Sequence, residues 1–319
     1  MLLNEINFFS HLNKFNCFEK YPNVAVGVSG GPDSIALAYL LDKWIRTQKG
    51  KLQALIFDHR LRPNSKEESL QVKKNLQDLQ IASKILTPKK NLLIKKNMEQ
   101  ARNNRLGKLI NFCNKNNILH LFLGHHFDDN LETYLIRKVN GSNFEGLGSM
   151  EEITYFTKIQ IIRPFIKVKK KSIIKFNKER KLFFLDDPSN QDLKYTRVKV
   201  RNYLNTNQYN KFIKHDFIKI KKEIPHYKDM IWSIFIEILI HASSKKIKLN
   251  RLKLIEFDKL IMEKIVLLCL KYFSYQNYKA RSSKIIKFIN EMIKPNFKFY
   301  DLGGVLIRNR EETLIFSQK

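Results

Sequence analysis

The sequence predicts an α/β protein with a doubly wound parallel sheet and a second, smaller, mostly helical domain that ends in a small β-hairpin. Up to about residue 185, short apolar runs alternate with stretches of helical length, and this alternation is typical of βαβ units around a parallel sheet. From about residue 205 the pattern changes to long stretches rich in Lys, Ile and Phe. We therefore predict two domains, residues 1–205 and residues 206–319.

The first domain is predicted to alternate strands and helices in a regular order. Short apolar runs bounded by turn residues predict strands at 24–28, 52–57, 81–86 and 119–123. Amphipathic stretches predict helices at 35–44, 65–79, 98–113 and 128–139, with Asn64 or Ser65 as the cap of the second. Parallel sheets bind ligands beyond the carboxyl ends of their strands, so the residues that follow these strands are the candidates for a functional site.

The second domain is predicted from three helical stretches and two alternating ones. Helices are expected at 212–223, 232–241 and 258–272. After Gly303 and Gly304, the alternating segments 305–308 and 313–316 predict the closing hairpin.

The charge of the chain gives the first indication of a partner. There are 59 Lys and Arg against 30 Asp and Glu, a net charge of +29, of which the two predicted domains carry +17 and +12. Such an excess is typical of proteins that bind nucleic acid. A coding bias toward Lys, Ile and Asn would produce the same excess, so charge alone leaves both explanations open.

Neither a membrane segment nor a cysteine motif is expected. The longest apolar stretch with few charges, residues 230–242, includes Glu237 and is too short to span a bilayer. The N-terminus lacks the basic region of a signal peptide. Cys17, Cys113 and Cys269 are too far apart in the sequence for a metal or redox motif. We therefore expect a cytoplasmic protein with no membrane partner.

The segment after the first strand has the composition of a phosphate-binding loop. Its glycines let the backbone approach a phosphate, its proline suits the first position of a helix, and a helix N-terminus presents free N–H groups. Asp33 is a candidate Mg²⁺ ligand. No Walker-type lysine is present, and an ordinary turn between a strand and a helix is the alternative. The loop residues are Ser29, Gly30, Gly31, Pro32, Asp33 and Ser34.

The segment after the fourth strand combines two histidines with three carboxylates. Asp128 and Glu132 share one face of the predicted helix, and Asp129 lies beside it. The alternative is a structural role, in which Asp129 and Glu132 form a capping box and the histidines pack within the loop. The polar residues concerned are His125, His126, Asp128, Asp129, Glu132 and Thr133.

Both segments resemble motifs of the PP-loop ATPases, which cleave ATP between the α- and β-phosphates. Residues 29–34 resemble their SGGxDS pyrophosphate loop. Residues 124–133 resemble the AHHxDDQxET segment of one branch, the tRNA(Ile)-lysidine synthetases, with Asn130 in place of Gln. The resemblance implies the PP-loop form of the doubly wound fold.

Five further segments resemble the same family in the same order along the chain. They are 58–65 (DHGLRxxS, with Arg60 for glycine), 99–106 (ExARxxRY, with Leu106 for Tyr), 141–147 (RGSGxxGLxGM), 163–165 (RPLL) and 186–201 (EDxSNxxxxYxRNxxR, with Val198 for Asn). The second domain resembles the family only loosely, in its closing hairpin. The chain is too short for the further C-terminal domain that some members carry.

The resemblance implies an ATP-dependent ligase. It would join lysine to C2 of the wobble cytidine, position 34, in the CAU anticodon of tRNA(Ile), through an adenylated cytidine. The product, lysidine, changes the codon that is read from AUG to AUA. ATP and Mg²⁺ would be the cofactors, and tRNA(Ile) and L-lysine the partners. The second domain would bind tRNA, and a homodimer is compatible with the sequence.

The resemblance also implies roles for single residues. ATP would be bound by residues 29–34 together with Asp58 and His59, and Mg²⁺ by Asp33. The ε-amine of lysine, with an ordinary pKa of about 10.4, must lose a proton before it attacks. Asp33, His125 and Asp129 are the predicted catalytic residues, and either Asp129 or His125 takes that proton. Substrate and RNA contacts are predicted for Arg102, Arg105, His126, Asp128, Glu132, Thr133, Arg197 and Arg201.

Two other functions stay open at this point. A tRNA-thiolating PP-loop enzyme of the 2-thiocytidine type would need paired cysteines, which this sequence lacks. A basic RNA-binding protein with a degenerate nucleotide site would be expected to have lost the acidic and serine residues of the loop, and these are intact.

Overall fold

The computed structural model describes residues 3–58, 60, 64–88, 98–156, 158–185, 196–206, 210–273 and 282–319. The chain divides into two compact units, Met1–Ile220 and Lys221–Lys319. The division falls inside helix α9 (Asn210–Ile238), further along the chain than the domain boundary at residue 205 that the sequence predicts. The first part of that helix therefore belongs to the unit that carries the parallel sheet.

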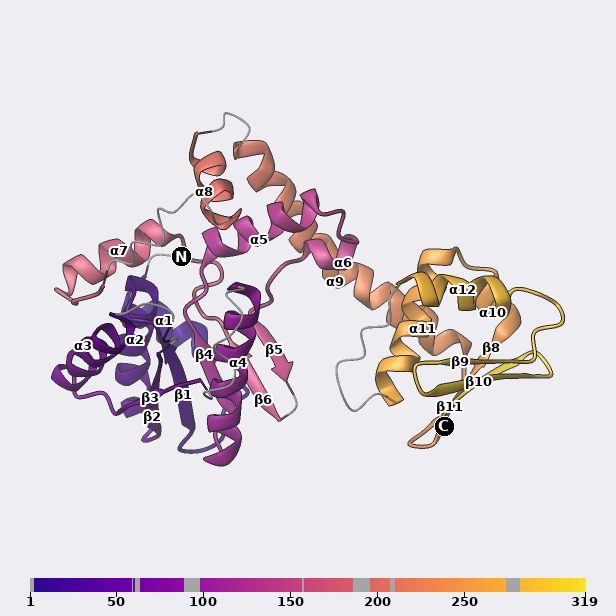
Figure 1. Ribbon diagram of the computed structural model, residues 1–319, viewed down its shortest axis with the longest axis horizontal. Coiled ribbons are helices and arrows are strands. Elements are labelled where there is room, and N and C mark those ends of the chain that lie inside the picture. Colours follow the sequence, from indigo (N-terminus) through magenta and orange to yellow (C-terminus); the bar gives the residue numbers. More distant parts are fainter. Residues whose placement is uncertain are drawn as a thin grey trace. The chain divides into compact units, whose positions relative to one another are not determined.

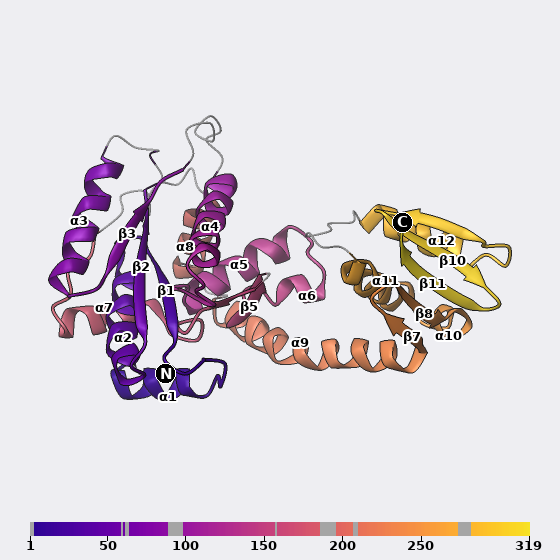
Figure 2. The same ribbon diagram turned by 90° about the horizontal axis from the view of Figure 1, so that it is seen from below.

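Unit 1 is built on a six-stranded sheet that is parallel except at one edge (Figures 1 and 2). The strand order is β3-β2-β1-β4-β6-β5, and β5 runs antiparallel to β6. The four predicted strands are confirmed, whereas β5 and β6 lie between residues 139 and 170, where the sequence analysis predicts no strand or helix. The strands are β1 (Asn23–Val28), β2 (Lys51–Phe57), β3 (Ser83–Leu86), β4 (His120–Leu123), β5 (Ile153–Phe156) and β6 (Ile159–Ile162).

Helices cover both faces of this sheet, as the sequence predicts. Val24, Val26 and Val28 of β1 belong to the core under α1, α2, α3 and α7, while Ala25 belongs to the core under α4. This alternation follows from the period of two in a strand. The helices of unit 1 are α1 (Glu5–Asn13), α2 (Pro32–Thr47), α3 (Ser65–Asp78), α4 (Met98–Lys115), α5 (Phe127–Val139), α6 (Phe144–Leu147), α7 (Lys170–Glu179) and α8 (Thr196–Thr206).

Unit 2 is built on a five-stranded antiparallel sheet in the order β7-β8-β11-β10-β9. One face of the sheet packs with α11 and α12 into a separate core. The predicted closing hairpin is confirmed as β10 and β11, and the predicted helix at 258–272 is α11. The elements are β7 (Leu239–Ser243), β8 (Lys246–Asn250), α10 (Arg251–Ile255), α11 (Lys259–Phe273), α12 (Ser282–Met292), β9 (Phe299–Leu302), β10 (Val305–Arg310) and β11 (Thr313–Gln318).

The sequence prediction for unit 2 is wrong in one place. The helix expected at 232–241 ends at Ile238, and Leu239 begins β7. The signal for the next strand was present, since buried Ile247 and Leu249 alternate with lysines. These short strands add to the predicted hairpin and make it part of a full sheet. In the described ranges, no helix has the length and apolar character needed to cross a membrane.

Two glycines allow close approach at the carboxyl edge of the parallel sheet. Gly30, after β1, has φ +89°, and a Cβ atom there would lie 2.5 Å from Cγ2 of Val72 on α3. Gly124, after β4, lies so near α2 that a Cβ atom would be 3.2 Å from the carbonyl of Asp33. Both positions therefore determine how the loops pack where the candidate site residues lie.

Replacing Gly30 by Ala should lower the free energy of unfolding by about 1–3 kcal/mol, because this φ is strained for any residue with a Cβ atom. Gly107→Ala, inside α4, is the matched control, since its Cβ atom would meet nothing within 4 Å. This control should raise the stability by about 0.5–1 kcal/mol. Urea denaturation measures both changes, and a Gly30 variant as stable as the wild type would contradict the strained loop.

Candidate active site

The phosphate loop is held in shape by its own side chains. Ser34 is buried in the first turn of α2, where its hydroxyl accepts the Ser29 N–H at 3.1 Å and donates to the Gly31 carbonyl at 3.0 Å. Pro32 is the first residue of α2, and Gly31 precedes it with an extended backbone. Among the described residues no side chain caps α2. Hydrogen bonds within the loop thus hold its shape beside a helix N-terminus that no side chain caps in the described residues.

Three helices begin at this edge of the sheet, and hydrogen bonds connect them. The fully buried Asn177, in the last turn of α7, donates from its side chain to the Pro32 carbonyl at the start of α2 at 2.9 Å. The Lys170 N–H, at the start of α7, donates to the Asp128 carboxylate of α5 at 2.7 Å. Because each helix N-terminus carries partial positive charge, their convergence favours an anionic ligand.

His126 connects the phosphate loop to α5. It is the N-cap of α5: its Nδ1 accepts the Asp129 N–H at 3.3 Å, and the Asp129 carboxylate accepts the His126 N–H at 3.2 Å. The neutral imidazole therefore carries its proton on Nε2, which lies 3.7 Å from Oδ1 of Asp33 and 3.4 Å from Oδ2 of Asp129. The capping box thus runs from His126 to Asp129, and the alternative that paired Asp129 with Glu132 is wrong.

Asp129 lies among basic side chains that keep its carboxyl ionised. Burial raises the pKa of its carboxyl, but the imidazoles of His126 and His125 and the guanidinium of Arg197 outweigh burial, and the pKa lies below the usual value. Burial lowers the pKa of the Arg105 guanidinium, and the like charge of Arg197 acts in the same direction. The structure therefore brings Arg105 and Arg197, which lie far apart in the sequence, to the segment that contains His125, His126 and Asp129.

A second group of predicted residues joins α5 to α8. Glu132 is almost completely buried and accepts from Arg201, with Nε to Oε1 at 2.8 Å and Nη2 to Oε2 at 3.4 Å. Burial raises the pKa of Glu132, and the bond from Arg201 acts against that rise. The Thr133 hydroxyl donates to the Asp129 carbonyl at 2.8 Å and accepts from Arg197 at 3.3 Å. Both arginines are thus fixed beside the catalytic candidates.

Asp58 lies at the carboxyl end of β2 and shapes the turn after it. Its buried carboxylate accepts the Arg60 N–H at 2.9 Å. Arg60 stands where the resembling motif has glycine, and it takes the φ of +52° that glycine would adopt without strain. The turn therefore forms despite the substitution, with the Asp58 hydrogen bond as support.

Several predicted residues lie outside the described part of the chain. His59, residues 186–190 and Tyr195 are among them. Arg102 lies on α4, but its side chain is not described. The roles predicted for these residues stay predictions.

Lys170 is a residue of this site that the sequence analysis missed. Its ammonium pairs with the Asp33 carboxylate. A signal was present, because Lys169, Lys170 and Lys171 stand at the start of a helix, where the helix dipole disfavours cations. Asn130, which stands where the resembling motif has Gln, also supports the site: its buried amide forms two hydrogen bonds, of 2.8 and 3.1 Å, with the backbone of Met150.

The donor atoms around Asp33 fit a magnesium ion that is shared with phosphates. Oδ1 of Asp33 is buried and has no hydrogen-bond partner among the described residues. In the same part of the chain, no group of three or more His, Cys, Asp or Glu side chains could hold a metal alone. Mg²⁺ is commonly held by one or two carboxylates together with substrate phosphates, so this donor set suits that arrangement.

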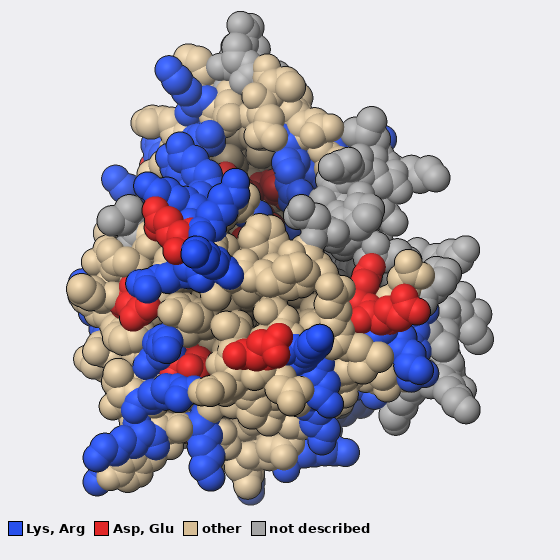
Figure 3. All heavy atoms as spheres, turned by 90° about the vertical axis from the view of Figure 1, so that its left-hand side faces the viewer, with Lys and Arg blue, Asp and Glu red and all other residues tan. Residues whose placement is uncertain are grey.

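The surface around the site is strongly basic. Figure 3 shows the face of unit 1 that carries α3 and α7: Lys and Arg side chains gather around a recess, and acidic atoms are visible in its depth. The exposed lysines of α7 include Lys171, Lys175 and Lys178. A positive rim around recessed carboxylates favours a polyanionic substrate.

The comparisons with known proteins agree with this geometry. The PP-loop domain family matches residues 4–208. A tRNA(Ile)-lysidine synthase from Wolbachia pipientis wMel is 30% identical over 317 residues, which cover 95% of this chain and 72% of the relative. The chain belongs to the tRNA(Ile)-lysidine synthase family. Another tRNA(Ile)-lysidine synthase, from Wolbachia sp. subsp. Brugia malayi, is 31% identical over 312 residues, or 71% of its length.

Coverage and fold similarity differ among the relatives. A tRNA(Ile)-lysidine synthase from Orientia tsutsugamushi is 35% identical over 200 residues, and this match spans less than half of it, 45%. A U34-tRNA thiolase from Methanococcus maripaludis has the same fold, with a TM-score of 0.56 at 18% identity over 69% of this chain and 79% of the thiolase. The latter similarity concerns the fold alone.

The ion pair between Glu132 and Arg201 should be strongly coupled. In a double-mutant cycle with Glu132→Gln and Arg201→Gln, we expect a coupling free energy of about 1–3 kcal/mol, because Glu132 is buried. The control pair is Lys175 and Glu179, which lie 3.7 Å apart with side chains 71% and 59% exposed. Its coupling should stay below about 0.5 kcal/mol. Equal coupling of the two pairs would contradict a buried, fixed Glu132.

Proposed function

We propose that the protein joins L-lysine to C2 of the wobble cytidine in a CAU-anticodon tRNA(Ile), with ATP as the energy source, and so forms lysidine. The observation that carries the proposal is the position of Asp129. Its ionised carboxylate lies 3.4 Å from Nε2 of His126, at the edge of the sheet that carries the phosphate loop, and the charge of Arg197 helps to lower its pKa. This arrangement offers negative charge for the amine of lysine next to a site for phosphates. Membership of the family supports the same reaction.

The first step is adenylation of the cytidine. Its C2 oxygen attacks the α-phosphorus of ATP, the bond to the bridging oxygen breaks, and pyrophosphate leaves with the electron pair. The N-termini of α2, α5 and α7 would stabilise the charge on the leaving pyrophosphate, and the exposed Ser29 would donate to it. Ser34 would maintain the loop, because its hydroxyl already donates to Gly31.

In the second step the ε-amine of lysine attacks C2, and AMP leaves with the bonding electron pair. Neutral pH lies about 3 units below the ordinary pKa of this amine, so removing its proton costs ~4 kcal/mol. The ionised Asp129 would hold the ammonium by its charge and accept the proton that the amine must lose before its lone pair can attack C2. His125 is the second candidate for this proton. Arg197 would bind phosphate groups of the nucleotide or the tRNA.

Mg²⁺ belongs to the proposal as a cofactor. When bound, it would supply positive charge beside the phosphates, and Asp33 is the residue that would hold it. Asp58 and residues 29–34 would bind the rest of the nucleotide. The reaction does not require a second copy of the chain, and the homodimer stays a prediction. A cytoplasmic location is proposed because the tRNA substrate is found there.

Sulfur transfer to tRNA is disfavoured by where the cysteines lie. Cys17 packs against the core under α2, Cys113 lies in the core under α4, and Cys269 lies in the core of unit 2. Burial raises the pKa of the Cys113 thiol to about 12 and that of Cys269 as well. Thiols that stay protonated and apart cannot share a cluster or act as paired nucleophiles. Loss of nucleotide binding is disfavoured by the intact, ordered loop.

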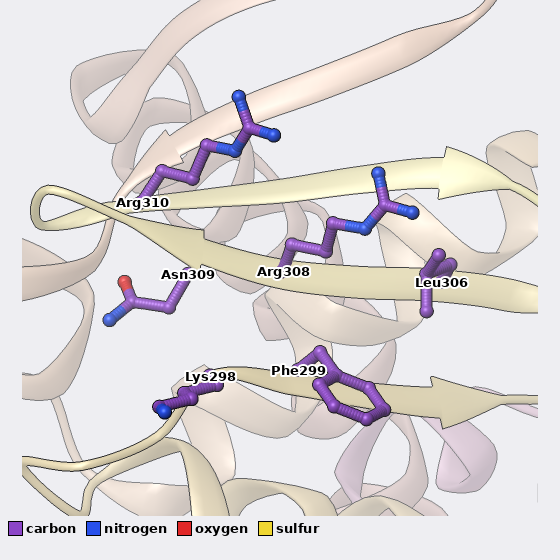
Figure 4. A pocket seen from close by; sticks show the side chains of 6 residues that line it. All are labelled: Lys298, Phe299, Leu306, Arg308, Asn309 and Arg310. Atoms are coloured by element: carbon purple, nitrogen blue, oxygen red, sulfur yellow. The ribbon is translucent and has the colours of Figure 1, made fainter.

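Unit 2 offers a surface for the tRNA backbone. Figure 4 shows a shallow pocket on the outer face of β9 and β10, where Phe299 lies opposite Arg308 in the strand register. Phe299 is 68% exposed, and Lys298 and Arg310 line the same pocket. Exposed aromatic and basic side chains on a sheet are suited to stack bases and neutralise phosphates. We therefore propose this face as the tRNA contact of unit 2.

The decisive experiment is incorporation of labelled lysine into a CAU-anticodon tRNA(Ile) transcript in the presence of Mg-ATP. We expect label in the RNA that survives mild alkali, because a C2–N bond is not an aminoacyl ester. Asp33→Asn should reduce the reaction by orders of magnitude and leave tRNA affinity nearly unchanged, since it removes the proposed metal-binding charge. Alkali-labile label, or sulfur in place of lysine, would contradict the proposed function.

The proposed tRNA surface predicts a change in salt dependence. Replacing both Arg308 and Arg310 by Ala should weaken tRNA binding and lower the slope of log K against log salt by about one for each phosphate that is no longer neutralised. Lys287→Ala is the control, because α12 packs through Phe288 against Tyr300 on the inner side of the sheet. Filter binding at several salt concentrations measures the slopes. An unchanged slope in the double variant would place the RNA contacts elsewhere.

A further inference from the structure

Lys170 is a charged residue of the site to which the proposed reaction assigns no role. It is the first residue of α7, its ammonium pairs with Asp33, and its N–H donates to Asp128 at 2.7 Å. Its side chain is 35% exposed and that of Asp33 is 22% exposed. The pair therefore lies in the wall of the site, where a ligand can reach it.

The position of Lys170 is fixed by the packing of α7 on α2. Ile173 and Phe176 are buried, and the ring of Phe176 meets that of Tyr39 with centroids 6.0 Å apart. Asn177 adds the buried hydrogen bond to the Pro32 carbonyl. The ammonium is thus presented from a rigid element and not from a surface loop.

Local helix energetics do not account for a lysine at this position. The first turn of α7 contains no acidic residue, and the N-terminus of a helix repels cations. Lys170 is stabilised by the tertiary pair with Asp33, which is 137 residues away in the sequence. Because the charge of Lys170 is unfavourable at the start of its own helix, its presence there indicates a role in the site.

The phosphate loop itself lacks a cation. Residues 29–34 contain no Lys or Arg, whereas the loop of Walker-type ATPases carries its own lysine. The two oxygens of Asp33 differ: Oδ2 faces Lys170, and the buried Oδ1 has no hydrogen-bond partner in the described part of the chain. In this structure Lys170 therefore supplies the positive charge that pairs with Asp33.

We propose that Lys170 is the phosphate-binding cation of this site and that it exchanges partners when nucleotide binds. Its ammonium moves from the Asp33 carboxylate to an oxygen of the β- or γ-phosphate, and Asp33 becomes available to the metal ion. As the bond from the α-phosphorus to the bridging oxygen breaks, Lys170 neutralises the pyrophosphate that departs with the electron pair. The inference rests on the proposed use of ATP and adds a residue to it.

Nucleotide binding tests the first half of this exchange. The probe is α,β-methylene-ATP, which cannot be cleaved between the α- and β-phosphates, titrated by calorimetry into the full chain without tRNA. Lys170→Ala should weaken its binding about tenfold or more, as expected for loss of a charge-assisted hydrogen bond. Lys170→Arg, which keeps the charge, should recover part of the affinity. Lys115→Ala, which removes an exposed lysine in the last turn of α4, is the control and should stay within about twofold of the wild type.

The response to Mg²⁺ alone tests the second half. Lys170→Ala leaves Asp33 without its counter-ion, so Mg²⁺ should raise the melting temperature of this variant more than that of the wild type. Asp33→Asn in the same background should abolish the difference. A purely structural Lys170 would predict the opposite, because a damaged site would respond less to both nucleotide and metal.

Two results would overturn the exchange: wild-type affinity for the analogue in Lys170→Ala, or a metal response in that variant no greater than in the wild type. Both measurements are independent of lysine incorporation. If the wild type binds the analogue through Lys170 but forms no lysidine, the proposed function is wrong and the phosphate role of Lys170 stands.

Discussion

The site depends on how α5 begins. β4 ends at Leu123, Gly124 leaves room for α2, and His126 then caps α5 with its imidazole. Because the cap uses Nδ1, the opposite nitrogen of the ring faces Asp33 and Asp129 at the same time. A serine or aspartate would cap a helix equally well, but neither could connect these two carboxylates. The cap therefore sets the geometry of the site as well as the start of the helix.

Charge in the site is balanced in pairs that come from different elements. Asp33 of α2 is paired with Lys170 of α7, and Glu132 of α5 with Arg201 of α8. Ion pairs that are only partly exposed to solvent, as these are, contribute little net stability, because the desolvation of both charges offsets their attraction. Their value lies in holding positive and negative groups a short distance apart. A reaction that combines a phosphate leaving group with an amine nucleophile needs such a separation.

The strongly basic composition has more than one structural cause. In unit 2, Arg251 is buried and donates to the carbonyls of Met292 and Lys294 at 2.7–3.0 Å, so this cation supports the fold. Arg308 and Arg310 lie instead on the outer face of the sheet, beside an exposed aromatic ring. A net charge counts both kinds equally, and only the position of each side chain separates structural cations from those available to RNA.

Local sequence was enough to predict the parallel sheet, its helices and most of the residues at its carboxyl edge, because these depend on periodicity and on which side chains follow each strand. The phosphate loop was also predictable from local sequence, because its conformation depends on the glycines and the proline within residues 29–34. The pairings depend on the tertiary structure: His126 with Asp33, Arg201 with Glu132, and Lys170 with Asp33. Contacts between residues as far as 137 positions apart leave no periodic signal in the chain. Only the packing of α5, α7 and α8 at one edge of the sheet brings them together.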